Sequence, residues 1–228
     1  MKILNLSLAG ENYEVYEFVS PGSMENFLRK HTHEFYTERL SIHSLITEKG
    51  EFGKFYARFG SITPKLMEDC AVWSLAKLKA KQVLSIDEPE IGKDIQINPM
   101  GQDPTKGDGT WQFANYDIDR VLYVKKEFQP ISSHVCQVYS PNSLSVDYLK
   151  MIKEKNRQLP FLRSTYYDSF LIEIIIFFEK PELFNIDSLS KDIKKFKTQY
   201  SNELRWNTFL SFILWGDENI KIYRVRLS

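Results

Sequence analysis

The stretch SFLIEIIIFFEK, residues 169–180, decides the class of fold. Residues 170–178 of this stretch are an almost unbroken apolar run, and Glu173 is the one charged residue among those nine. A strand with one face in water alternates apolar and polar residues, whereas a strand covered on both faces is apolar throughout. The nine residues FLIEIIIFF are too few to span a bilayer. We therefore expect a central strand here, covered on both faces of a sheet.

Further strands and helices are expected on both sides of this run, from the spacing of apolar residues and the positions of turn residues. The predicted strands cover residues 3–8, 13–19, 39–47, 52–60, 110–116, 120–127, 133–140, 207–215 and 220–227. The predicted helices cover residues 24–32, 61–84, 143–156 and 187–204. Because strands and helices do not alternate along the whole chain, the order predicts an α+β protein with a mainly antiparallel, twisted sheet and about four helices.

The length of the chain suits one large core. It has 228 residues, of which 43% are hydrophobic, and we expect residues 1–228 to form a single compact domain. Residues 86–109 differ from their surroundings, because they hold four of the ten glycines and three of the nine prolines. We interpret this segment as a long loop and as the candidate boundary between two subdomains.

The balance of charge limits the kinds of partner. The 30 basic and 30 acidic residues cancel, whereas a protein that grips nucleic acid mainly through phosphates usually has a basic excess. The two cysteines, Cys70 and Cys136, follow no disulfide framework and indicate a reducing compartment. No secretory signal is apparent at the N-terminus, so we expect a soluble protein in the cytoplasm with no membrane partner.

Cys70 and His134 are the candidate residues of a thiol hydrolase. A cysteine on a helix and a histidine on a later strand could supply a nucleophile and its base. However, Cys70 shares a helical stripe with Leu66 and Trp73, which is typical of a buried core thiol. We expect His134 near the start of a sheet strand and Cys136 packed within it.

Glu173 is the first candidate catalytic carboxylate, and Asp168 is the second. A carboxylate in a central strand is costly unless it is paired, so Glu173 needs a partner such as Arg163, Arg205 or a ligand. Buried carboxylates with a shifted pKa recur as catalytic groups, but they also occur in structural ion pairs, which is the simpler explanation here.

Four aspartates in the 86–109 loop and just after it are the candidate metal ligands. They could converge on a divalent cation, which would then be the cofactor, although a solvated loop with Asp-Gly turns explains them more simply. No EF-hand, P-loop, dinucleotide-binding or zinc-deaminase motif accompanies them. The four residues are Asp103, Asp108, Asp117 and Asp119.

A modest basic surface is predicted from the last helix and the last strand. Lysines beside an aromatic and two arginines are suited to phosphate contacts and base stacking, although helices with lysine-rich outer faces are common. The residues are Lys194, Lys195, Lys197, Tyr223, Arg224 and Arg226.

These patterns favour a non-catalytic role. The leading hypothesis is a binding or assembly component of an intracellular system, in a prokaryote or a phage, with a protein or a nucleic acid as the partner. A hydrolase of an unrecognised family, above all a metal-dependent nuclease that uses the acidic residues, is the alternative. The thiol hydrolase built on Cys70 and His134 is the third hypothesis.

Overall fold

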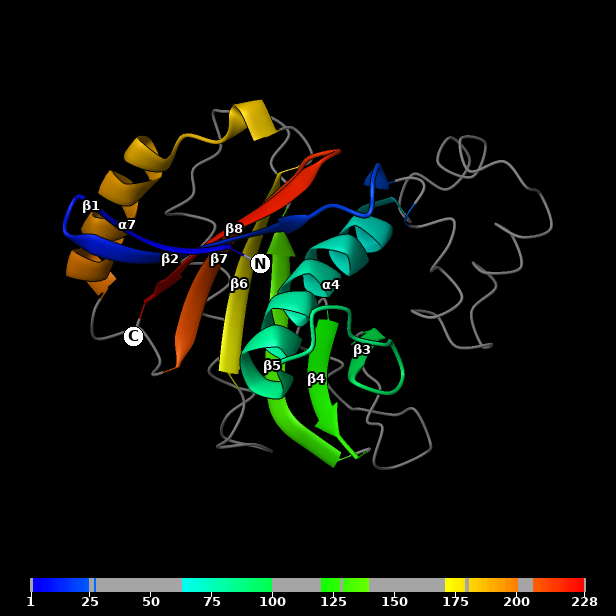
Figure 1. Ribbon diagram of the computed structural model, residues 1–228. Helices are drawn as coiled ribbons and strands as arrows, with labels where there is room; N and C mark the ends of the chain where they lie inside the picture. Colours follow the sequence, from blue (N-terminus) through cyan, green and yellow to red (C-terminus); the bar gives the residue numbers. More distant parts are fainter. Residues whose placement is uncertain are drawn as a thin grey trace.

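A single sheet of eight strands dominates the part of the chain that the structure describes (Figure 1). The computed structural model describes residues 2–24, 27, 63–99, 120–127, 129–139, 171–178, 181–200 and 207–227. The strands follow the order β1-β2-β8-β7-β6-β5-β4-β3 across the sheet. They are β1 (Lys2–Leu8), β2 (Glu11–Val19), β3 (Ile95–Pro99), β4 (Arg120–Lys126), β5 (Gln129–Tyr139), β6 (Leu171–Phe178), β7 (Thr208–Trp215) and β8 (Asn219–Arg226).

The predicted fold class was wrong in two respects. The sheet is mixed, because β6 pairs in parallel with both β5 and β7, while the other five strand pairs are antiparallel. In place of about four helices, the described residues contain two α-helices, α4 (Thr63–Leu84) and α7 (Ile186–Tyr200), with a short 3-10 turn, η1 (Pro181–Leu183). The chain still combines α and β structure, with more sheet than we predicted.

The connection between β6 and β7 explains the parallel pairing. Parallel neighbours need a crossover that returns the chain to the same end of the sheet, and a helix usually provides it. Helix α7 lies between β6 and β7 in the sequence and packs on one face of the sheet (Figure 1). The strand-helix-strand order of residues 169–215 was visible in the sequence, but we did not interpret it as a crossover.

Strand β6 has the central, doubly covered position that its sequence predicts. Ile172, Ile174 and Ile176 belong to the core on the α7 side, whereas Ile175 and Phe177 belong to the core on the α4 side. All of its side chains after the first are buried. Because β6 is covered on both faces, it has no need of polar residues for solubility.

Helix α7 is amphipathic, as its sequence predicts. Leu189, Ile193 and Phe196 are each 3% exposed or less and pack against the sheet. The side-chain oxygen of Asn185 accepts a hydrogen bond from the backbone N–H of Ser188 at 3.0 Å, which caps the start of the helix.

Helix α4 is buried on all sides rather than along one stripe. Every residue from 69 to 80 is buried, including Lys77 and Lys79. Charged side chains in such a helix need partners, since an unpaired buried charge is strongly unfavourable. Lys77 pairs with Glu88, which follows the helix, at 2.6 Å, whereas Lys79 faces a carboxylate of the sheet that is described below.

Part of the predicted 86–109 loop is a strand. Residues 95–99 form β3, which pairs with β4 at one edge of the sheet. The predicted hairpin at 39–60, the strand at 110–116 and the helix at 143–156 lie outside the described residues, as does most of the predicted helix at 24–32.

Candidate functional site

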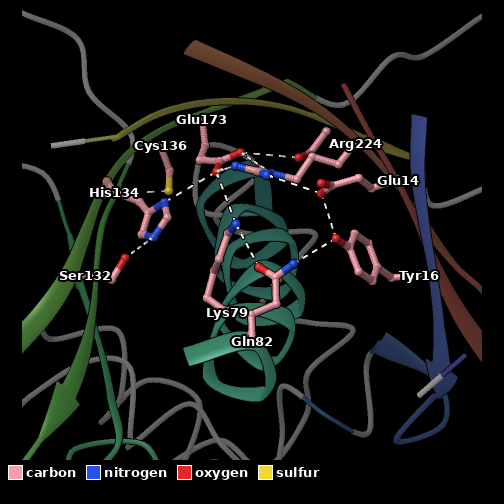
Figure 2. Close-up of polar contacts among 10 residues, drawn as sticks. Glu14, Tyr16, Lys79, Gln82, Ser132, His134, Cys136, Glu173 and Arg224 are labelled. Atoms are coloured by element: carbon pink, nitrogen blue, oxygen red, sulfur yellow. Dashed lines mark hydrogen bonds and ion pairs between the residues drawn. The ribbon is translucent and has the colours of Figure 1, made fainter. Parts of the chain in front are cut away.

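Glu173 is the centre of a polar cluster between the sheet and helix α4 (Figure 2). The pleat of β6 turns this side chain to the α4 side, where it is fully buried. Arg224 of β8 donates from Nη2 to Glu173 Oε1 at 2.6 Å and from Nε to Oε2 at 3.4 Å. Ser211 of β7, which lies between these two strands, donates its hydroxyl to Oε2 at 3.3 Å. Two nitrogens of one guanidinium thus bind both carboxylate oxygens, an arrangement of high directional strength.

Two further titratable groups approach the same carboxylate. Lys79 Nζ, from α4, lies 4.0 Å from Glu173 Oε1, and His134 Nδ1, from β5, lies 3.4 Å from it. We refer to Glu173, Arg224, Lys79 and His134 as the buried polar cluster. Each of their side chains is 7% exposed or less.

The protonation states of this cluster follow from burial and charge. Burial alone would raise the pKa of the Glu173 carboxyl, but the charge of Arg224, with smaller contributions from His134 and Lys79, holds that pKa well below its usual value. Burial lowers the pKa of the Lys79 ammonium from 10.5 to about 8, against the attraction of Glu173. Burial also lowers the pKa of His134 from its usual 6.5, although Glu173 acts in the opposite direction. At neutral pH the cluster therefore holds an ionised glutamate and a neutral histidine.

A closed ring of polar contacts joins this cluster to Tyr16 and Glu14 of strand β2 (Figure 2). From Lys79 the ring continues to Gln82 at 3.1 Å, and Gln82 donates to the hydroxyl of Tyr16 at 2.8 Å. That hydroxyl donates to Glu14 at 2.6 Å, and Glu14 Oε2 lies 3.6 Å from Arg224 Nη1. The ring ties the C-terminal part of α4 to strands β2, β6 and β8.

A pocket of about 630 Å³ opens where the ring reaches Glu14. It lies over β1, β2, β8 and β7, on the α4 side of the sheet. Its lining is mostly polar, and Arg224 forms part of its wall. The guanidinium of Arg224 stacks on the ring of Phe209, with Cζ 3.5 Å from the ring centroid. The lining residues are Asn5, Leu6, Ser7, Asn12, Tyr13, Glu14, Phe209, Arg224 and Arg226.

A second branch of contacts leaves the cluster through His134. Ser132 Oγ lies 2.8 Å from His134 Nε2, and both residues are on β5. The thiol of Cys136 lies 3.9 Å from the backbone oxygen of His134. His134 and Cys136 are both fully buried on the strand, and His134 lies in the middle of β5 rather than near its start.

The structure brings together three residues to which the sequence assigned different roles. Glu173 was a candidate acid, His134 a candidate base for a thiol, and Arg224 part of a basic surface; all three meet in the buried polar cluster. The partner of Glu173 is Arg224, whereas Arg163 and Arg205 lie outside the described residues. Cys70 is fully buried on α4.

The other predicted site residues are dispersed or outside the described part of the chain. Lys194 and Lys195 are exposed on α7, on the opposite side of the sheet from the pocket, and Lys197 pairs with Glu11 at 2.8 Å. Tyr223 packs against Phe184 on the α7 side, with ring centroids 4.9 Å apart. Asp168 and the four predicted metal ligands, Asp103, Asp108, Asp117 and Asp119, lie outside the described residues.

Sequence reasoning missed Lys79 and Ser132. Lys79 falls in the run AKLKAKQ, where it resembles the other lysines of a solvated helix end. The signal that could have singled it out is its position on a long helix opposite a central strand that carries a carboxylate. Ser132 stands two residues before His134, so the two side chains share one face of a strand, and that spacing was a usable signal.

No family model matches the chain, and no curated protein or solved structure is significantly similar to it. Neither helix in the described ranges is both long and apolar enough to cross a membrane. The described residues also contain no group of three or more His, Cys, Asp or Glu side chains placed to hold a metal ion. The described residues hold two features of chemical interest, a fixed guanidinium at a pocket and a serine beside a buried histidine.

Proposed function

We propose that the protein is a binding module that holds an anionic group of a protein partner in the pocket beside Arg224. The observation that carries the proposal is the fixed guanidinium at the pocket wall. Glu173 binds two of its nitrogens, and Phe209 covers one of its faces. Because the arginine is already ordered, a ligand need not restrict a flexible side chain, which favours affinity.

Glu14 lines the pocket with Oε2 3.6 Å from Arg224 Nη1, and the rest of the lining suits a carboxylate-bearing partner. Arg226, two residues from Arg224 on β8, is exposed at the pocket and adds a second guanidinium, the group that best matches a carboxylate. Asn5, Asn12 and Ser7 add neutral donors and acceptors. The volume of about 630 Å³ lies within the range of ligand pockets.

A protein partner fits these features better than a nucleic acid. The net charge is zero, and the described basic residues do not form a stripe, since the α7 lysines and the pocket arginines lie on opposite sides of the sheet. Next to the pocket, β1 is at the edge of the sheet among the described strands, with Ile3 57% and Leu4 50% exposed. An edge strand with apolar side chains is suited to pairing with an extended polypeptide.

The test compares two charge reversals in a capture experiment. Immobilised wild-type protein, Arg226→Glu and Lys195→Glu are incubated with extract of the source cells, with and without nuclease. Lys195→Glu is the matched control, because it makes the same charge change at an exposed site on α7, away from the pocket. We expect one protein to be captured by the wild type and the control and to be lost with Arg226→Glu, whatever the nuclease treatment.

Two results would count against this function. Equal capture by all three proteins would remove the pocket from recognition. Capture that disappears on nuclease treatment would identify a nucleic-acid partner instead.

A further inference from the structure

Ser132, His134 and Glu173 form a second arrangement that the binding role does not use. Ser132 Oγ lies 2.8 Å from His134 Nε2, and His134 Nδ1 lies 3.4 Å from Glu173 Oε1. A hydroxyl, an imidazole and a carboxylate in this order are the parts of an activated serine, which is recognised by geometry rather than by sequence position.

We infer that Ser132 is a nucleophile and that the protein carries an acyl-transfer activity toward small carboxylic esters. This activity is independent of partner binding at the pocket. Ser132 lies at the end of the contact chain Ser132–His134–Glu173–Arg224, whereas the pocket adjoins the Arg224 end. Either proposal therefore stands if the other fails.

The charge beside His134 favours the tautomer that the reaction needs. Glu173 is ionised and lies 3.4 Å from Nδ1, without an aligned hydrogen bond, so its charge favours the ring proton on Nδ1 and leaves Nε2 to accept the hydroxyl proton of Ser132. The imidazole is fully buried, and burial keeps it in the neutral form that can act as a base.

The bonds formed and broken are those of ester hydrolysis. Ser132 Oγ attacks the carbonyl carbon of the ester while its proton passes to His134 Nε2. The C–O bond to the alcohol breaks, and the departing oxygen takes that proton. Water then attacks the acyl-serine by the same route, which releases the acid and restores Ser132, so that ester and water yield acid and alcohol.

Ser132 and His134 differ in their exposure to solvent, as expected for a nucleophile and its buried base. Ser132 is partly exposed, whereas His134 is fully buried. Ser133, the next residue, is also partly exposed, but its side chain lies on the opposite face of β5. It provides a matched control with the same residue type and the same strand.

The experiment is intact-mass analysis after treatment with a fluorophosphonate, which labels a serine hydroxyl only where a base activates it. Wild type, Ser132→Ala and Ser133→Ala are treated folded and in urea. We expect one adduct on folded wild type and on Ser133→Ala, none on Ser132→Ala, and none on any unfolded chain. Circular dichroism confirms that Ser132→Ala is folded.

Either of two results would overturn the inference. If folded wild type takes up no adduct, Ser132 is not activated. If Ser132→Ala is labelled to the same extent as wild type, the reacting hydroxyl is elsewhere.

Discussion

The two faces of the sheet bury β6 in different ways. On the α7 side, Ile172, Ile174 and Ile176 meet the apolar stripe of the helix. On the α4 side, Ile175 and Phe177 also lie in an apolar core, but Glu173 collects Arg224, Lys79 and His134 around it. The same strand thus packs with hydrocarbon alone on one face and includes a charged cluster on the other.

The difference between the two faces indicates that the buried polar cluster has a role other than covering β6. The α7 side shows that hydrocarbon packing can cover β6, and burying charges costs several kcal/mol per ion before pairing compensates. The buried polar cluster is therefore not explained by the need to cover a strand. It holds Arg224 at the pocket and His134 beside Ser132.

The largest effect on the free energy of unfolding is expected from removing the guanidinium of Arg224. Arg224→Met leaves Glu173 buried without its bidentate partner, which should lower the free energy of unfolding by about 3–5 kcal/mol. Urea denaturation at neutral pH measures the change. A loss below about 1 kcal/mol, the size of an ordinary surface pair, would mean that water or the neighbouring lysine replaces the guanidinium without cost.

Lys79 is expected to make the free energy of unfolding depend on pH. Its folded pKa of about 8 lies below the unfolded value of 10.5, so between these pH values the unfolded chain binds more protons and the free energy of unfolding rises with pH. At 1.36 kcal/mol per pKa unit the rise is about 3 kcal/mol at most. Lys79→Met should lack this rise.

The comparison of the two proteins isolates Lys79 from other groups. Tyr16, whose pKa burial raises, is present in both proteins and has no direct contact with Lys79, to which it is joined through Gln82. Urea denaturation at pH 7, 8, 9 and 10 gives the two curves, and Lys195→Met serves as an exposed lysine control. Parallel curves for wild type and Lys79→Met would show that the ammonium is not desolvated in the fold.

The smallest effect on the free energy of unfolding is expected at an exposed ion pair between β2 and β8. Glu17 and Lys221 face each other across β2 and β8, 3.8 Å apart, with side chains 29% and 45% exposed, whereas the side chain of Arg224 on β8 is 5% exposed. Lys221→Ala should change the free energy of unfolding by less than about 1 kcal/mol. A larger loss in urea denaturation would show that cross-strand position, rather than burial, sets the strength of these pairs.

The sequence predicted the elements better than their arrangement. The apolar run of β6 and the stripe of Leu189, Ile193 and Phe196 record local burial, so their positions could be inferred directly. The parallel pairing of β6 with β7 depends on where the chain returns after α7, and we did not interpret the strand-helix-strand order of residues 169–215 as such a return. That is why we predicted a mainly antiparallel sheet.

For the buried polar cluster, the sequence predicted that Glu173 has a partner but did not identify that partner. The cost of burying Glu173 made a partner necessary, and this part of the prediction followed from physics alone. The identity of the partner did not, because Arg224 stands 51 residues away and meets Glu173 only through the order β6-β7-β8. Beside Tyr223 and Arg226, Arg224 has the pattern of a basic surface, although it is 4% exposed.

The central claim is that Glu173 and Arg224 form one unit that organises the α4 side of the sheet. A double-mutant cycle with Glu173→Gln, Arg224→Met and both together, measured by urea denaturation, tests it most directly. We predict that the double variant loses less than the sum of the single losses, with a coupling energy of about 2–3 kcal/mol. Losses that add to within about 0.5 kcal/mol would show two independent residues and would contradict the claim.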